Sequence, residues 1–200
     1  MKQQVDKGEV FLVVAIIVVV LLIVVCYEAG SSAQFGLSST VGTGDGYGYA
    51  RAVVTPVYSK IVTSDIVIDS IYIHGRKGSS TNRNIDVAVY KKRNGLPTDK
   101  IWSKTITFTS VTAYWLATAC TVSVYAPDTI CLAFGNQNNT YTRVSQRDSV
   151  SGVGSNAADT TLPNPWVQGS TSAKLWAFYA VYHEGTVAAD SCTKRVRMRL

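Results

Sequence analysis

Residues 85–90 read Ile85-Asp86-Val87-Ala88-Val89-Tyr90, and residues 66–73 read Ile66-Val67-Ile68-Asp69-Ser70-Ile71-Tyr72-Ile73. In the first stretch Ile85, Val87 and Val89 share one face, because successive side chains of an extended chain point to opposite sides. A period of two, filled by β-branched residues, is typical of a strand with one buried face. These two stretches decide the fold class in favour of β structure.

Similar runs continue along the chain, and turn-forming residues such as those at 75–84 and 91–97 separate them. No helical period lies between the runs. About eight or nine short strands in this order predict an antiparallel β-sandwich. The other predicted strands are residues 49–58, 101–108, 113–117, 121–125, 129–134 and 175–182.

The order of short motifs adds a resemblance to a known family. The motifs are Ile71-Tyr72-Ile73-His74-Gly75, Asp86-Val87-Ala88-Val89-Tyr90, Gly95-Leu96-Pro97, Tyr114-Trp115, Thr129-Ile130-Cys131-Leu132-Ala133-Phe134, Leu162-Pro163-Asn164-Pro165-Trp166 and Leu175-Trp176-Ala177-Phe178-Tyr179-Ala180-Val181-Tyr182. This series resembles a jelly-roll module of phage tail and virion proteins and of prokaryotic surface proteins, over about residues 47–183. Lys91 departs from the acidic residue usual after the tyrosine. The family has no common catalytic activity, so the resemblance implies a jelly-roll-like sandwich and no particular reaction.

The N-terminal region holds a different kind of segment. Residues 10–26 are seventeen residues without a polar side chain. At about 1.5 Å per residue they span about 26 Å, near the thickness of the bilayer hydrocarbon. We therefore predict one transmembrane-type α-helix within residues 1–27 that contacts membrane lipid through residues 10–26. Lys2 and Lys7 precede the run and no Lys or Arg follows before Arg51, which favours an exterior head.

Two alternatives concern the leader. A cleaved signal peptide has an apolar region of about 7–15 residues, shorter than this run, which favours an uncleaved anchor. Gly8, directly before the run, resembles the cleavage site of type IV prepilins, with Glu9 at the start of the mature chain. Cleavage after Gly8 stays open, as does the choice between a virion and a cell-surface filament.

The remainder divides into three parts. Residues 28–48 are rich in Gly, Ser and Thr and predict a flexible linker, residues 49–183 form the head, and residues 184–200 form a basic tail. Residues 194–199 within the tail hold four basic residues and no acid, which equals most of the net charge of +6, and they suit an anionic lipid surface or an acidic subunit. Nucleic acid is not expected among the partners. The predicted partner-binding residues are Lys194, Arg195, Arg197 and Arg199.

Residues suited to catalysis or metal binding are few. His74 and His183 are the only histidines, and the chain contains no H-E-x-x-H, C-x-x-C or G-x-S-x-G motif. We expect both histidines to be structural or surface residues. The sequence predicts no catalytic residue, no metal and no cofactor, and hence a protein that is not an enzyme.

Aromatic and amide side chains suggest a glycan site near residues 135–143, for which a solvated loop is the alternative. The predicted glycan-binding residues are Asn136, Asn138, Tyr141, Arg143 and Trp166. By contrast, Trp115, Trp176 and Phe178 lie in predicted strands, and we expect them in the core. Asn138-Asn139-Thr140 is also a glycosylation sequon, with Asn138 as acceptor.

The four cysteines fall into two groups. Cys120 and Cys131 lie on predicted neighbouring strands, so an exterior head predicts a disulfide between them. Cys26 lies at the membrane boundary, and Cys192 has no predicted partner.

Together these features predict a non-enzymatic structural subunit: a membrane-anchored jelly-roll protein of a virion capsid or spike, or of a pilin-like surface filament. It would form homo-oligomers or join other structural subunits. The alternative is a membrane-tethered glycan-binding adhesin or receptor-binding protein that uses the loops at 135–143 and 162–169.

Overall fold

The computed structural model describes residues 32–39, 45–47, 53–54, 59–78, 84–136, 142–148, 154–157, 162–172 and 174–185. The predicted helix within residues 1–27 and the basic residues of the tail lie outside these ranges. Among the described residues, no helix is long and apolar enough to cross a membrane.

The described residues form strands joined by turns and bends, and none of them is helical, which confirms the predicted all-β class. The strands are β1 (Ala33–Gly36), β2 (Asp45–Tyr47), β3 (Val53–Val54), β4 (Ser59–Val62), β5 (Ile66–Arg76), β6 (Asn84–Arg93), β7 (Leu96–Thr107), β8 (Tyr114–Val124), β9 (Asp128–Asn136), β10 (Arg143–Asp148), β11 (Gly154–Ala157), β12 (Gln168–Ser172), β13 (Lys174–Trp176) and β14 (Phe178–Glu184).

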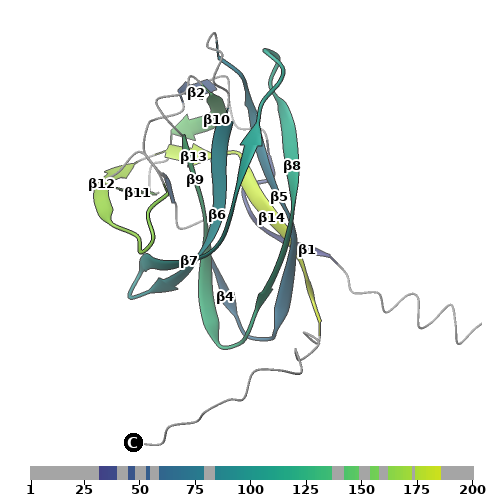
Figure 1. Cartoon of the computed structure of the whole chain (residues 1–200), viewed down its shortest axis with the longest axis vertical. Helices are drawn as coiled ribbons and strands as arrows, with labels where there is room; N and C mark the ends of the chain where they lie inside the picture. The colour runs from purple at the N-terminus through teal and green to yellow at the C-terminus, as the bar shows by residue number, and fades with distance from the viewer. Residues whose placement is uncertain are drawn as a thin grey trace, which may run out of the picture. The chain divides into compact units, whose positions relative to one another are not determined.

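The strands build two antiparallel sheets, which lie one against the other in Figure 1. Sheet A has the order β1-β14-β5-β10-β13, with β8 paired to β5 and β2 paired to β10. Sheet B has the order β12-β11-β3-β9-β6-β7, with β4 paired to β9. Successive strands lie in different sheets at β2–β3, β4–β5, β5–β6, β7–β8, β8–β9, β9–β10, β10–β11 and β12–β13, as expected for a β-sandwich.

The core lies between the inner faces of the sheets. Alternate residues of β5 and β6 supply most of its aliphatic side chains, and the rings of Phe134, Trp176 and Phe178 fill its centre. Phe134 meets Trp176 and Phe178 edge-to-face, with centroid distances of 5.2 and 5.5 Å. The predicted burial of Trp176 and Phe178 is confirmed, since both are 0% exposed.

A tight turn joins β6 to β7. Asn94 and Gly95 have φ values of 51° and 81°, as a two-residue hairpin turn with two left-handed positions requires. The turn that the sequence predicted over residues 91–97 is therefore limited to these two residues. Pro97 already belongs to β7 and is buried.

Several elements differ from the predicted ones, and β1, β2, β4, β10, β11 and β12 lie where no strand was predicted. β1 lies within the predicted linker and extends sheet A by pairing with β14. The predicted strands 113–117 and 121–125 are one strand, β8, because Thr118 and Ala119 continue the pairing with β5, opposite Ile71 and Ser70. β10 follows the loop at 135–143 and was not predicted.

Candidate binding face

Four ring-bearing side chains lie on the outer face of sheet A: Tyr72, His74, Trp115 and Tyr179, called here the aromatic cluster. Tyr72 and His74 belong to β5, Trp115 to β8 and Tyr179 to β14. In the sheet register Tyr72 is opposite Tyr179, and His74 is opposite Trp115. Their neighbours along each strand point into the core, so strand alternation places the cluster on the outer side.

The rings contact one another as a continuous set. Tyr72 and Tyr179 stack with 4.8 Å between centroids and 3° between planes. Trp115 meets Tyr179 edge-to-face at 5.1 Å and lies 5.1 Å from the His74 ring. β8 and β14 lie on either side of β5, roughly 10 Å apart by ordinary strand spacing. Trp115 and Tyr179 therefore lean toward each other across β5, and part of the indole lies along the sheet surface.

A buried hydroxyl positions the imidazole of His74. Nδ1 of His74 lies 2.7 Å from Oγ of Ser145, and Ser145 is 5% exposed. The backbone below is fixed as well: His74 N donates to Ala177 O and Ala177 N donates to Ser145 O, both at 2.9 Å. A serine nucleophile must be reached by its substrate. Because this hydroxyl is buried, the pair is better suited to holding the ring than to attacking a substrate.

The cluster combines apolar area with polar tips. All four side chains are half-buried. Burial, with a smaller contribution from Tyr72, raises the pKa of Tyr179, so its phenol stays protonated at neutral pH. Rings that carry one polar group are favoured at protein interfaces and can also stack on a sugar. The cluster therefore has the chemistry of a binding surface.

The outer face of sheet B carries a tyrosine that is covered. Residues 162–166, called here the clasp, lie over Tyr90 and bury it completely. The ring of Trp166 meets the Tyr90 ring edge-to-face at 5.4 Å and 85°, and Trp166 is 8% exposed. Leu162 and three small residues of the sheet, Ala88, Cys131 and Ala133, complete this second apolar cluster.

Hydrogen bonds fasten the clasp to β6 and β7. They run from Tyr90 Oη to Pro163 O at 2.6 Å, from Trp166 N to Thr98 O at 2.8 Å, from Lys100 N to Asn164 Oδ1 at 2.9 Å and from Lys100 Nζ to Leu162 O at 2.8 Å. Trp166 was predicted to bind a glycan. The structure corrects this assignment, because its ring packs on Tyr90 and is not available for stacking on a sugar.

Of the other predicted glycan-binding residues, the structure describes the placement of Arg143, which is not brought together with Trp166. Arg143 begins β10 in sheet A, where it is opposite Arg76 and Tyr47, whereas Trp166 covers sheet B. Asn136 ends β9 and its side chain lies outside the described part of the structure. Asn138, the predicted glycosylation site, and Tyr141 lie outside the described residues as well.

The predicted disulfide is not present. Cys120 and Cys131 are free thiols. Cys120 lies in the core between the sheets, and Cys131 lies under the clasp on the opposite face of sheet B. Burial raises the pKa of each thiol to about 12. The sequence placed the two residues on successive strands, but it did not show that their side chains point to different sides.

The second histidine is hydrogen-bonded to an aspartate on the outer face of sheet A. Nδ1 of His183 lies 2.9 Å from Oδ2 of Asp69, and both side chains are more than one-third exposed. Within the described residues, no group of three or more His, Cys, Asp or Glu side chains is placed to hold a metal ion.

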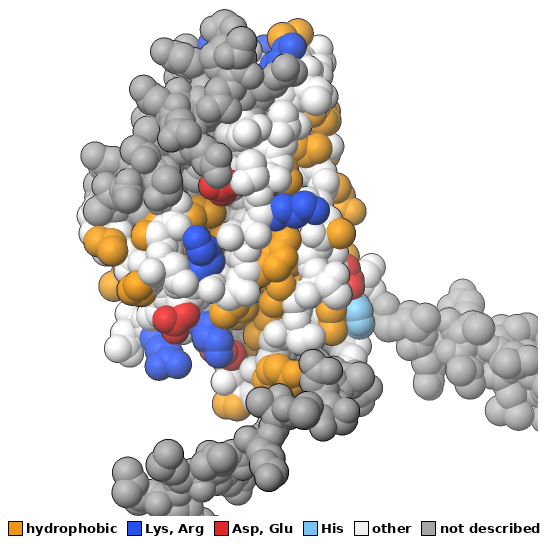
Figure 2. Space-filling model, in the orientation of Figure 1, with side chains coloured by type: hydrophobic (Ala, Val, Ile, Leu, Met, Phe, Trp, Pro, Cys, Tyr) orange, Lys and Arg blue, Asp and Glu red, His pale blue; other side chains and the backbone are white. Residues whose placement is uncertain are grey.

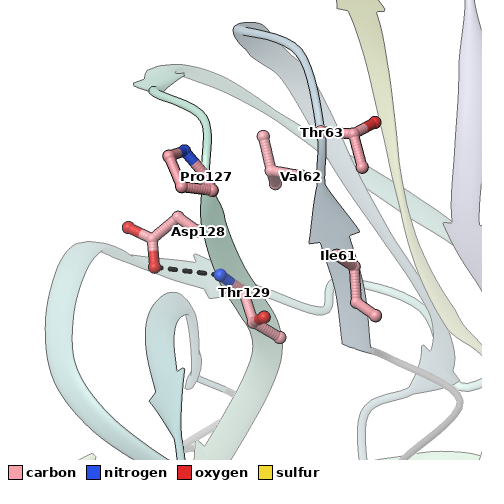
Figure 3. A pocket seen from close by; sticks show the side chains of 6 residues that line it. All are labelled: Ile61, Val62, Thr63, Pro127, Asp128 and Thr129. Carbon is pink, nitrogen blue, oxygen red and sulfur yellow. Dashed lines mark hydrogen bonds between the residues drawn. The ribbon is translucent and has the colours of Figure 1, made fainter.

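An open hollow lies where β4 and β9 begin to separate, and Figure 3 shows the side chains around it. It measures about 470 Å³ and is lined by Ile61, Val62, Thr63, Pro127, Asp128 and Thr129. The Asp128 carboxylate already accepts a hydrogen bond from Thr129 N at 2.9 Å and pairs with Lys91 Nζ at 2.7 Å. The hollow therefore lacks the converging polar groups of a specific ligand site.

Charge does not mark a further site on the face drawn in Figure 2. There the Lys, Arg, Asp and Glu side chains are scattered among uncharged residues instead of forming a patch of one sign. A broad basic patch is the usual mark of a nucleic-acid surface. The predicted partner-binding cations at Lys194, Arg195, Arg197 and Arg199 lie outside the described residues.

No protein-family model matches the chain, and no curated protein matches its sequence significantly. The function of the site is therefore inferred from its own geometry.

The sequence predicted Trp115 in the core, and this prediction was wrong. The alternation of side chains along β8 would have indicated its true position. Tyr114 and Leu116 pack against the core, so Trp115 between them points outward.

Proposed function

We propose that the chain is a non-enzymatic structural subunit: a jelly-roll-type sandwich held at a membrane by residues 10–26, with its head outside, in a virion or a cell-surface filament. In this proposal the outer face of sheet A contacts a neighbouring subunit. The basic tail adds contacts to an anionic lipid surface or an acidic neighbour.

One observation carries the proposal: the aromatic cluster lies half-exposed on a sheet face that no described segment covers. The core of a sandwich does not require aromatic rings on its outer faces, which can carry aliphatic and polar residues instead. Tyr and Trp are enriched at protein interfaces and often provide a large share of their binding energy. Here Tyr72, Trp115 and Tyr179 already contact one another. A partner would therefore meet a preordered surface and fix few additional side chains.

The test is the assembly of the full chain, followed by light scattering and electron microscopy. Trp115→Ala combined with Tyr179→Ala should reduce the fraction in particles or filaments at least tenfold. Val111→Ser provides a control, because Val111 is 62% exposed and lies in the loop before β8. A wild-type chain that stays monomeric, or a double variant that assembles normally, would contradict the proposal.

A glycan-binding role is a second candidate, and the same cluster favours it. The same outer face carries the amide of Gln34, which is exposed and lies opposite Val181 of β14. Neutral sugars bind to such combinations of rings and amides. Isothermal calorimetry with neutral oligosaccharides of glucose, galactose, mannose and N-acetylglucosamine would test this role. Binding that Trp115→Ala abolishes without altering assembly would favour the glycan; the reverse result would favour the subunit interface.

A further inference from the structure

β1 is a short strand at the edge of sheet A. It has four residues and pairs with β14 and, among the described residues, with no other strand. The register places Ala33 opposite Tyr182 and Gly36 opposite Tyr179. An edge strand of this length is held mainly by its one neighbour, so its attachment depends on how well it fits β14.

The fit of β1 to β14 is specific. Phe35 packs against the core beside Tyr182, with 6.0 Å between ring centroids. Leu37 N donates a hydrogen bond of 2.9 Å to Phe178 O. Gly36 has a φ of +107°, and a Cβ there would lie 2.5 Å from Phe178 O. The β14 edge thus accepts this segment closely and rejects a side chain at position 36.

The connections to β1 are long enough to exchange it between copies. Leu37 stays with β1, because its N–H is bonded to Phe178 O, so seven residues, 38–44, connect β1 to β2. Fully extended at about 3.4 Å each, they span about 24 Å, comparable with the width of a small sandwich. Upstream, only residues 27–32 separate β1 from the apolar run. Copies that associate through that run would hold their β1 strands close to one another.

We propose that β1 is an exchangeable strand, and that in the assembled protein each β14 edge is covered by β1 of a second copy of the chain. This inference rests on the proposed function, because it needs copies held side by side. The β14 edge forms the same hydrogen bonds and the same side-chain packing whether β1 comes from its own chain or from a neighbour. The local concentration of neighbours therefore decides which arrangement is populated, as in other strand exchanges and domain swaps.

Disulfide trapping between two chains, each with one introduced cysteine and the buried Cys120 and Cys131 retained, tests the exchange. Gln34 and Val181 lie opposite each other on the outer face, and neither belongs to the core. Cys26 and Cys192 are first replaced by Ser in the full chain. One chain then carries Gln34→Cys, and a second chain with a different tag carries Val181→Cys. Mixed in equal amounts, assembled and oxidised, they should form a covalent heterodimer in about half of the molecules, the limit set by random mixing of the two chains.

The control pairs Gln34→Cys with Ser123→Cys, an exposed position on β8 across the sheet; it should give less than one-tenth as much heterodimer. A second pair of variants tests the fit. Gly36→Asn and Gly95→Asn both replace a positive-φ glycine, but a Cβ at Gly95 meets nothing within 4 Å. Only Gly36→Asn should reduce the cross-link.

The outcomes separate the exchange from the proposed function. The same samples are examined by electron microscopy. Normal assemblies without the heterodimer, together with an intrachain disulfide in a Gln34→Cys/Val181→Cys chain, would overturn the exchange and leave the structural role intact. Chains that fail to assemble before any cysteine is introduced would overturn both.

Discussion

The outer faces of the two sheets each carry tyrosine and tryptophan, but the rings are buried on one face and half-exposed on the other. On sheet B the clasp covers Tyr90, and Trp166 arrives with the clasp itself. On sheet A, Tyr72, Trp115 and Tyr179 contact one another and remain half-exposed. The same residue types therefore complete the fold on one face and form a candidate contact surface on the other.

The difference lies in the polar atoms around the rings. The hydroxyl of Tyr90 donates to a backbone carbonyl of the clasp, so its burial leaves the donor satisfied. In the aromatic cluster, Ser145 supports His74 from below, while the tyrosines keep part of their surface toward solvent. The clasp should therefore contribute mainly to stability, and the aromatic cluster mainly to recognition. Three measurements test this contrast between the two faces.

The largest expected effect comes from the same substitution at the two tryptophans. Trp166→Ala removes a ring that is 8% exposed and uncovers Tyr90, which should cost about 3–5 kcal/mol of unfolding free energy. Trp115→Ala removes a half-exposed ring and should cost about 1 kcal/mol or less. Guanidinium unfolding of the full chain, followed by circular dichroism, measures both. Equal losses would mean that the aromatic cluster is as structural as the clasp.

Alkaline pH should weaken the clasp next. The pKa of the buried Cys131 thiol is about 12, against an ordinary 9.0, because burial disfavours the thiolate. Below pH 9 the thiol is protonated in both states and its contribution is complete. As pH rises from about 9 to about 12, the unfolded chain loses the proton first, so stability falls by on the order of 1 kcal/mol per pH unit.

Burial also raises the pKa of Tyr90, which acts in the same direction at higher pH. Unfolding titrations of the full chain between pH 8 and 11 measure the slope. Cys131→Ala should flatten it, and Cys120→Ala, whose thiol pKa is also about 12, should do so by a similar amount. A slope unchanged by Cys131→Ala would show that solvent reaches the thiol under the clasp.

The contrast between the faces also shows which features of the structure could be predicted from the sequence. Alternation predicted the β class, because strand parity is a local property, whereas the burial of Trp176 and Phe178 was predicted from their residue type and their place in predicted strands. The same parity would have placed Trp115 outward, between the inward-facing Tyr114 and Leu116. Its assignment to the core came from residue type, which does not determine the face of a strand.

The clasp could not be predicted in this way. Tyr90 and Pro163 are 73 residues apart in sequence, and the burial of Trp166 depends on their contact. Nothing local to residues 162–166 distinguishes a segment that folds onto a sheet from one that projects as a ligand-binding loop. Likewise, β1 lies in a Gly- and Ser-rich region, and its place in sheet A depends on the edge of β14, about 145 residues later.

The smallest expected effect is the removal of single phenol hydroxyls. Tyr90→Phe deletes the donor to Pro163 O, a bond of 2.6 Å beneath the clasp, and leaves that carbonyl without this partner. A lost buried hydrogen bond costs about 1 kcal/mol. Tyr179→Phe keeps the stacked ring on the outer face, where solvent can replace the contacts of the hydroxyl, so stability should change by less than about 0.5 kcal/mol. Circular dichroism melts of the two variants at pH 7 provide the comparison. If Tyr179→Phe destabilised the chain as much as Tyr90→Phe, the hydroxyl of Tyr179 would have to be held by the fold, and the aromatic cluster would lose its distinction from the clasp.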